Sequence, residues 1–402
     1  REMARRWSAR LARVLVALAL VTCAGGVREP RARGRLASPR IEVSDPARTF
    51  GNANVLGSGG SSLSAPPVRR APYDHTESQR FVFLAGAAYC DAGLESWTCP
   101  YCNDTSLVDV RVTTGAKNMR GYVGWDLERG VAVVAFRGTE PNSLENWLEN
   151  LDAHHTSWQL PPEPGSIVPP PPLRVHAGFL DSWKELRADT FAALSDIQLN
   201  RFKSKNAPLP VVVTGHSLGG ALATLCALEL AAAGYYVETG YAEYPGSEGS
   251  EVGHEGPDVV SEGHALKDSL SEDEESFFVT KPPPPPPPVR VRADVRGVRT
   301  FGSPRVGDIL FAAAYESVLG QKTWRVTHAH DVVPSVPPRL VGFHHVPTEV
   351  FYRPEVNATD VAEPRVCDGG GEDLACSDSE WTHTSIVDHL YYLDTYICGC
   401  NA

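Results

Sequence analysis

One stretch of the chain has the residue types of a nucleophilic serine on a tight turn: Thr214-Gly215-His216-Ser217-Leu218-Gly219-Gly220. It follows a Val-Val-Val run and precedes a long apolar stretch, so we expect a strand, a sharp turn and a helix. Glycines on both sides of Ser217 leave room for the strained backbone of such a turn. The Leu218 amide, at the helix start, would face a developing oxyanion. This context favours acyl-transfer chemistry over a glycine-rich turn with a bystander serine.

A serine hydroxyl is a poor nucleophile at neutral pH and needs a general base. On such a turn the partners follow in the order serine, acid, histidine. Asp331 comes just after a predicted strand, where open α/β sheets place functional groups, whereas Asp308 is better placed to cap a helix. We expect structural roles for the histidines of one strand-like segment, His344 and His345. Two later histidines remain as candidate bases, His383 and His389.

Two further patterns suggest metal ligands, but neither has the spacing of an established site. His328, His330 and Asp331 form an H-x-H-D sequence, which is weak evidence by itself. Cys99 and Cys102 form a C-x-x-C pair, but no second pair lies near them at zinc spacing. We therefore expect no metal and no organic cofactor.

The segments that must position these residues alternate between strands and helices from about residue 76 onward. Apolar runs predict buried strands over 131–136 and 210–214, and further strands are expected over 295–301 and 323–328. Helical periodicity predicts helices over 80–89, 178–199, 218–233, 308–319 and 386–397. This alternation predicts an α/β fold with a mostly parallel central sheet that is covered by helices on both faces.

The composition narrows the class of protein. Of 402 residues, 42% are hydrophobic and 21% are charged, which excludes a fully disordered chain. The longest apolar run, Val14 to Val21, is far shorter than the ~20 residues that span a bilayer, so we expect no stable membrane insertion. The net charge of −12 argues against nucleic acid as a partner.

The N-terminal region and one internal segment differ in composition from the rest. Four arginines, the apolar run and Thr22-Cys23-Ala24 predict a secretory signal peptide over 1–24 rather than a short anchor. Residues 25–75 are rich in Arg, Ser, Gly and Pro, which predicts a disordered leader or pro-segment before a catalytic domain over 76–402. Residues 238–288 are acidic and end in seven prolines. They predict a surface insertion with a stiff spacer, although such a tract also suits an SH3-like groove.

The remaining cysteines fit an oxidising compartment. After removal of the signal, eight are left, and most lie near the two ends of the predicted domain, as in secreted disulfide proteins. Cys226 lies in an apolar helical stretch and is expected to be a buried free thiol. Asn103 and Asn357 begin glycosylation sequons, which agrees with secretion.

Taken together, these residues resemble the secreted fungal class 3 triacylglycerol lipases, which are α/β-hydrolases. The resemblance covers most of residues 76–402 and rests on motifs in one order. They are Tyr89-Cys90, Trp97-Thr98-Cys99 with Cys102, Phe136-Arg137-Gly138-Thr139, Asn146-Trp147, Val175-His176-Ala177-Gly178-Phe179-Leu180-Asp181, Gly215 to Gly220, Phe301-Gly302-Ser303-Pro304-Arg305-Val306-Gly307-Asp308, Asp331-Val332-Val333-Pro334 and Asp388-His389.

The resemblance implies a role for each site residue. Ser217 would be the nucleophile, His389 the general base and Asp331 the residue that orients it. Thr139 would join Leu218 in the oxyanion hole. Implied disulfides are Cys99–Cys102, Cys367–Cys376 and one from Cys90 to Cys400 or Cys398.

The family also carries a short helical lid over the site. Here an apolar stripe at i, i+3, i+4 and i+7 suits that role: Leu144, Trp147, Leu148 and Leu151. Ordinary core packing is the alternative for this stripe. The resemblance thus implies a secreted, monomeric triacylglycerol lipase that meets its ester at an oil–water interface. The alternatives are a feruloyl esterase or phospholipase of the same fold, or a non-catalytic secreted binding protein.

Overall fold

The computed structural model describes residues 71–103, 105–203, 206–237, 289–354, 363–380 and 383–401. All of them belong to one compact unit, Arg70–Ala402. The predicted signal peptide and most of the leader, the insertion and the Asn357 sequon lie outside the described residues. Asn103 is described and exposed.

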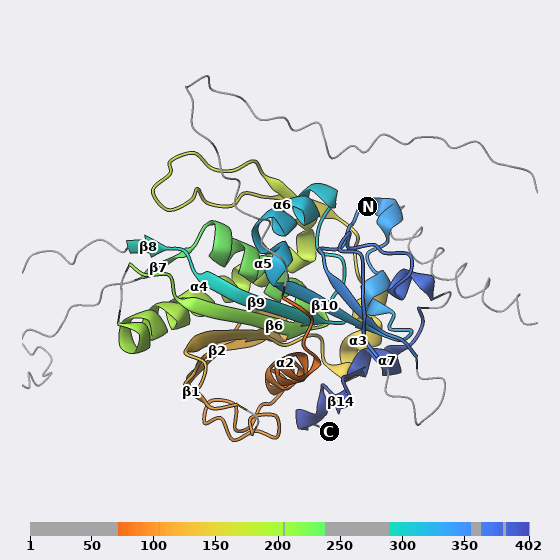
Figure 1. The fold of residues 1–402 in the computed structure, drawn as a ribbon, viewed down its shortest axis with the longest axis horizontal. Coiled ribbons are helices and arrows are strands. Elements are labelled where there is room, and N and C mark those ends of the chain that lie inside the picture. Colours follow the sequence, from red (N-terminus) through yellow and green to blue (C-terminus); the bar gives the residue numbers. More distant parts are fainter. Residues whose placement is uncertain are drawn as a thin grey trace, which may run out of the picture. The chain divides into compact units, whose positions relative to one another are not determined.

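The centre of this unit is a sheet of eight strands in the order β1-β2-β3-β6-β9-β10-β11-β12 (Figure 1). The five strands from β3 to β11 run parallel, and the strands at the edges pair antiparallel. The strand bounds are β1 Leu107–Thr114, β2 Arg120–Asp126, β3 Val131–Phe136, β6 Pro210–His216, β9 Asp294–Phe301, β10 Thr323–His328, β11 Glu349–Tyr352 and β12 Arg365–Val366. The predicted mostly parallel sheet is therefore confirmed.

Helices cover both faces of the sheet because neighbouring residues of each strand point to opposite sides. On one face, Val134 and Val213 pack in one core with the helices α4 (Ala177–Ile197), α5 (Leu218–Ala232) and α6 (Ile309–Leu319). On the other, Val133 and Val212 pack in a second core with α2 (His75–Ala87) and the C-terminal segment. β3 and β6 are buried on both faces, which explains their continuous runs of apolar residues.

The predicted C-terminal helix over 386–397 is wrong. Helix α7 is short, Ile386–Leu390, and a small hairpin of β13 (Tyr391–Tyr392) and β14 (Thr395–Tyr396) follows it. Leu393 and Asp394 make the turn with φ of 49° and 59°. The aromatic and threonine residues suit strands better than a helix, and the reversal carries the chain end back towards α2.

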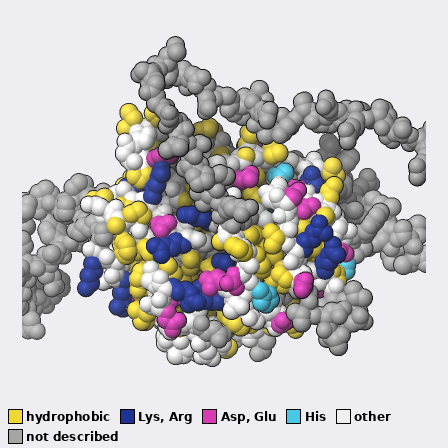
Figure 2. All heavy atoms as spheres, viewed as in Figure 1, with side chains coloured by type: hydrophobic (Ala, Val, Ile, Leu, Met, Phe, Trp, Pro, Cys, Tyr) yellow, Lys and Arg dark blue, Asp and Glu magenta, His cyan; other side chains and the backbone are white. Residues whose placement is uncertain are grey.

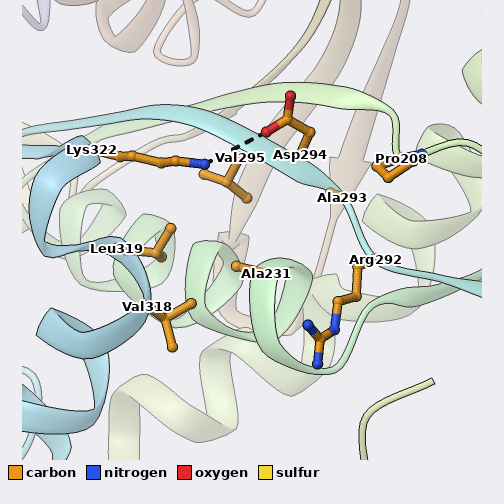
Figure 3. A pocket seen from close by; sticks show the side chains of 9 residues that line it. All are labelled: Pro208, Ala231, Arg292, Ala293, Asp294, Val295, Val318, Leu319 and Lys322. Carbon is orange, nitrogen blue, oxygen red and sulfur yellow. Dashed lines mark ion pairs between the residues drawn. The ribbon is translucent and has the colours of Figure 1, made fainter. Parts of the chain in front are cut away.

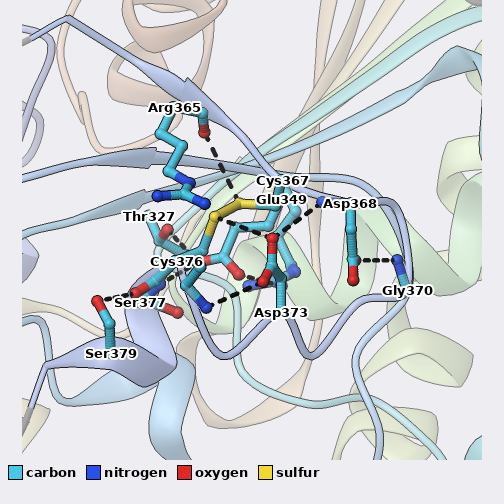
Figure 4. The surroundings of a disulfide bond; sticks show 12 residues. Thr327, Glu349, Arg365, Cys367, Asp368, Gly370, Asp373, Cys376, Ser377 and Ser379 are labelled. Atoms are coloured by element: carbon cyan, nitrogen blue, oxygen red, sulfur yellow. Dashed lines mark hydrogen bonds and ion pairs between the residues drawn. A yellow bond between two sulfur atoms is a disulfide. The ribbon is translucent and has the colours of Figure 1, made fainter.

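Within the described residues, three disulfides link the chain: Cys90–Cys400, Cys99–Cys102 and Cys367–Cys376. They are the pairs that the resemblance implies, with Cys400 as the partner of Cys90. Cys226 and Cys398 are buried free thiols. Figure 4 shows the Cys367–Cys376 bridge beside Glu349 of β11, whose carboxylate accepts a hydrogen bond from the Thr327 hydroxyl at 2.6 Å.

Besides the β13–β14 hairpin, two short pairs of strands lie outside the central sheet in the described part of the chain. β4 (His155–Trp158) and β5 (Leu173–His176) form a hairpin, and β7 (Tyr235–Val237) pairs with β8 (Val289–Val291). Figure 2 shows acidic, basic and apolar side chains interspersed on one face of the molecule. Among the described residues, no helix has the length and apolar character to cross a bilayer.

Candidate active site

Ser217 sits on the turn between β6 and α5 with φ of 58° and ψ of −130°, a conformation that non-glycine residues rarely adopt. Close packing of the main chain enforces it. A Cβ atom on Gly215 would lie 2.2 Å from the Gly219 carbonyl oxygen, and one on Gly219 would lie 2.1 Å from that of Phe136. The Ser217 amide also donates a hydrogen bond to the Phe301 carbonyl at 2.9 Å. Neighbouring strands therefore hold the strained serine in place.

The second feature of the site is a buried pair of Asp331 and His389. Asp331 follows β10, His389 lies on α7, and their exposed fractions are 2% and 0%. The Nδ1–H of His389 donates to both carboxylate oxygens of Asp331, at 2.9 and 2.8 Å. The carboxylate also accepts from the Val333 amide at 2.8 Å and from the Tyr392 hydroxyl. These bonds leave the Nε2 lone pair of His389 available to take a proton.

The structure brings these two features together. The His216 ring, next to Ser217 in the chain, lies 4.4 Å from the ring of His389, measured between centroids. The Ser217 hydroxyl and the His389 Nε2 are both buried, and neither has a hydrogen-bond partner among the described residues. A buried polar atom without a partner is costly and often marks a functional site. Here the two such atoms belong to the groups predicted to exchange a proton.

Both predicted oxyanion donors line one cavity of about 680 Å³. Leu218 is the first residue of α5, so its amide has no acceptor within the helix. Thr139 follows β3 and is half-buried at the cavity wall. The two residues thus follow different parallel strands, β3 and β6, and line the same cavity.

Helix α3 (Leu144–Glu149) covers this cavity and carries the predicted lid stripe. Leu144 is fully packed, as the core-packing alternative expected. Trp147 and Leu151 line the cavity, and Trp147 stacks on Phe179 with the ring centroids 6.5 Å apart. The helix ends before Leu151, and Leu148 is half-buried. The stripe is therefore divided between core and cavity.

Burial holds three histidines around the site in the neutral form. His176 caps α4 through its Nδ1, which accepts the Phe179 amide at 3.3 Å, and burial lowers its pKa to about 4. Burial also holds the pKa values of His216 and His345 well below the ordinary range. Each of these imidazoles therefore binds a proton less readily in the fold than in water.

We expect acid to destabilise the fold through His176. Its pKa is 6.5 in the unfolded chain and about 4 in the fold, so between these values the unfolded state binds more protons. The contribution of neutral His176 to the free energy of unfolding is fully present above pH 6.5. It falls by about 3 kcal/mol as the pH drops to 4. The His176→Asn variant keeps an acceptor for the cap but does not titrate. Urea unfolding from pH 7 to 4 should give a shallower loss for the variant, and equal slopes would contradict the assignment.

The H-x-H-D sequence does not form a metal site in the structure. His328 Nδ1 donates to the Asp388 carbonyl at 3.1 Å, and His330 lies 3.8 Å from Glu380. The Asp331 carboxylate accepts a hydrogen bond from His389 Nδ1. Within the described ranges, three possible ligand atoms meet only at two disulfide pairs with a neighbouring Cys99 or Glu349.

A second hollow, of about 430 Å³, is lined by Arg292, Asp294 and Lys322 among others (Figure 3). It is at the N-terminal end of β9, where Asp294 pairs with Lys322 at 3.6 Å. Ser217 is bonded to the opposite end of the same strand, at Phe301. The other cation of the hollow, Arg292, is paired with Glu163. This hollow therefore belongs to the surface and not to the candidate active site.

Sequence reasoning did not assign three residues that contact the site. Tyr392 donates to Asp331, and it lies three residues after His389. His216 is inside the serine motif, and Tyr89 is in the Tyr-Cys pair at the end of α2. The motifs contained these residues, but only the tertiary structure gives them partners.

Comparisons with known proteins agree with this geometry. The family described as "Lipase (class 3)" matches residues 133–240 and 286–341. A lipase of Rhizomucor miehei is 29% identical over 329 residues, covering 79% of this chain and 69% of its own length. "Secreted mono- and diacylglycerol lipase 1" of Fusarium solani is 29% identical over 284 residues, covering 70% of this chain and 61% of its own length.

Solved structures show the same similarity. A propeptide complex of Rhizomucor miehei lipase superposes with a TM-score of 0.55 at 26% identity, over 83% of this chain and 82% of that one. Lipase II from Rhizopus niveus gives a TM-score of 0.54 at 25% identity, over 81% of this chain and 96% of that one. A third, described as a triacylglycerol lipase whose catalytic centre is a serine protease triad, gives a TM-score of 0.54 at 26% identity, over 83% of this chain and 99% of that one.

Proposed function

We propose that the chain is a class 3 lipase, a secreted serine hydrolase of carboxylic esters with triacylglycerol as its substrate, and its similarity to that family supports the proposal. One observation carries the proposal for this chain's own residues. The Asp331–His389 pair leaves His389 Nε2 without a partner among the residues described, in the same buried centre as the hydroxyl of a strained serine that also has none there.

In the proposed mechanism, His389 Nε2 takes the proton of Ser217 as the Ser217 oxygen attacks the ester carbonyl. Asp331 stabilises the imidazolium that forms. The amides of Thr139 and Leu218 stabilise the oxyanion, and one such donor is typically worth about 3 kcal/mol. His389 then gives the proton to the leaving alcohol, and water, activated by the same base, hydrolyses the acyl-enzyme.

The cavity under α3 suits an acyl chain. Its apolar walls include Trp147, Leu151 and Phe179, and the oxyanion donors lie at the same wall. Glu145 and Glu149 are exposed on the other side of α3. We propose that α3 is a lid that opens at an oil surface, where its apolar side gains contact with lipid. In this proposal the protein acts as a monomer.

The test is hydrolysis of an emulsified long-chain triacylglycerol beside a soluble short-chain ester, with Ser217→Ala as the blank. The proposal expects a Ser217-dependent rate that rises once the oil phase appears. Activity on the soluble ester alone would indicate an esterase, such as a feruloyl esterase. No Ser217-dependent rate on either, from folded protein, would contradict the enzyme and favour a binding protein.

We further propose that residues 1–24 are a signal peptide and 25–75 a pro-segment that precedes the catalytic domain. Support comes from the basic and apolar order of the first residues and from the secreted relatives. A solved neighbour is a lipase in complex with its propeptide. The N-terminal residue of the mature protein, read by mass spectrometry from secreting cells, tests both boundaries.

We expect the segment 238–288 to be dispensable for hydrolysis. Val237 and Val289, which flank it, are paired directly in the β7–β8 ladder. A two-residue Asn-Gly turn can therefore replace the segment without moving either strand. The shorter loop should raise the free energy of unfolding by up to ~3 kcal/mol.

The shortened chain should keep the wild-type rate on both esters, measured side by side with thermal unfolding. A folded variant that has lost hydrolysis would assign the segment a catalytic or substrate-binding part. The hydrolysis and the unfolding midpoint together separate that outcome from misfolding.

A further inference from the structure

The hydroxyl of Tyr89 joins the oxyanion loop to the nucleophile turn. Tyr89 lies just after α2 and is 2% exposed. Its oxygen accepts the Gly138 amide at 3.1 Å, and it lies 2.8 Å from His216 Nδ1. Gly138 directly precedes Thr139, and His216 directly precedes Ser217. One side chain thus contacts the residue before a predicted oxyanion donor and the residue before the nucleophile.

His216 extends this connection to the base. Its Nε2 lies 2.8 Å from the carbonyl oxygen of His389, and that oxygen can only accept. The Nε2 atom therefore carries the hydrogen. Because the ring is buried and neutral, its Nδ1 must accept, and the Tyr89 hydroxyl must donate to it. Every hydrogen in this chain of three bonds consequently has one defined position.

The two loops also touch directly, so a small shift in one would move the other. A Cβ atom on Gly138 would lie 2.5 Å from both the Tyr89 oxygen and the His216 carbonyl oxygen, and 2.7 Å from Ser217 Cβ. Only glycine allows this approach. Without the Tyr89 hydroxyl, the buried Gly138 amide would lose its acceptor and would have to move towards another.

The disulfide framework holds Tyr89 from the other side. Its neighbour Cys90 is bonded to Cys400, and the buried Cys398 thiol forms a hydrogen bond with the Tyr89 hydroxyl. Tyr101 adds a tie to the same chain end by accepting the Gly399 amide at 2.8 Å. The Tyr89 side chain is therefore held in place before substrate binds.

We propose that Tyr89 and His216 are positioning residues that keep the Thr139 oxyanion donor and the His389 base aligned on Ser217. The proposal rests on the ester hydrolysis proposed above. Neither residue would touch the substrate, and their effect would appear as transition-state stabilisation. A misplacement of about 1 Å in such a site can cost about 100-fold in rate.

The first variant is Tyr89→Phe, with Tyr122→Phe as its matched control. Tyr122 is also fully buried, and its hydroxyl also makes a hydrogen bond to the α2 region, to the Leu84 carbonyl at 2.8 Å. Both variants lose one buried hydroxyl, but only the first touches the proposed network. Rates on a soluble ester are measured per active site, counted by end-point titration with a phosphonate inhibitor.

We expect Tyr89→Phe to lower kcat by about 10- to 100-fold with little change in KM. The dissociation constant of an alkyl boronic acid, which mimics the tetrahedral intermediate, should rise by a similar factor. Tyr122→Phe should keep wild-type values for both. Equal kinetics for the two variants, with equal losses of stability, would overturn the positioning role.

A second pair of variants tests His216 independently. In His216→Gln the side-chain amide can still donate to the His389 carbonyl, whereas His216→Ala removes every bond. We expect the Gln variant to retain roughly 10-fold more kcat per titrated site than the Ala variant. Equal rates from two folded variants would contradict the proposal for this residue.

The proposed function and the positioning role fail in different ways. If wild-type protein shows no hydrolysis above the Ser217→Ala blank, the proposed function is wrong, and the positioning role falls with it. If the wild type hydrolyses esters and Tyr89→Phe matches Tyr122→Phe, only the positioning role is wrong. The blank is therefore measured before the Tyr89 and His216 variants.

Discussion

Replacing Ser217 with alanine is expected to lower kcat for ester hydrolysis by about 10⁶-fold, the loss typical of removing a triad nucleophile. We expect the stability of the fold to stay unchanged. The Ser217 hydroxyl has no hydrogen-bond partner within the described part of the chain, so its removal leaves no other polar group without a partner. Alanine also meets the same backbone constraint at φ of 58° as serine does.

The measurement pairs hydrolysis of a soluble ester with urea unfolding of the same preparation. We expect a rate near that of the reaction without enzyme and a free energy of unfolding within about 0.5 kcal/mol of wild type. A variant that keeps more than a small fraction of the rate would show that another group is the nucleophile. Ser303, which packs against Gly220, is a suitable control and should retain activity as Ser303→Ala.

Replacing Asp331 with asparagine is expected to lower kcat by about 10⁴-fold, because the base would adopt the wrong tautomer. In the structure the carboxylate oxygens accept three donors: the Val333 amide, the Tyr392 hydroxyl and His389 Nδ1–H. An asparagine can keep one oxygen towards Val333, but its amide group then faces His389. That amide favours a proton on Nε2, where Ser217 needs a free lone pair.

The control for this variant is Asp388→Asn, one residue before the base. Asp388 accepts the His330 amide at 3.1 Å and has no bond to the imidazole of His389 in the described structure. We expect it to change kcat by less than about 10-fold. If Asp388→Asn lost more activity than Asp331→Asn, the assignment of the orienting acid would be wrong. The comparison needs only the soluble ester and titrated active sites.

The sequence determined the central elements of this fold because their signals are local. The runs at 131–136 and 323–328 became β3 and β10 with the predicted bounds. The run at 131–136 is apolar throughout because β3 is buried on both faces, whereas β10 also carries the buried polar side chains of Thr323, Arg325 and Thr327. The turn at Ser217 was equally local, since its glycines are next to the serine in the chain.

Weaker local signals led to errors at the edges. β1 and β2 were not predicted, because neither forms a continuous apolar run like that of β3; β1 instead has the alternating pattern of a half-buried edge strand. The C-terminal helix was predicted to be too long. Its aromatic residues have helical spacing, but they pack and bond across a hairpin, with Tyr392 reaching Asp331.

For the candidate site, the sequence by itself singled out Ser217, Asp331 and His389, whose catalytic roles are proposed here. It left open which cysteine pairs with Cys90 and gave Tyr89 no role. Both depend on contacts between residues that are far apart in the chain, Cys90 with Cys400 and Tyr89 with His216. Only the tertiary structure decided them, because a hydrogen bond or a disulfide forms where the packed backbone places two groups, and no spacing along the chain encodes that distance.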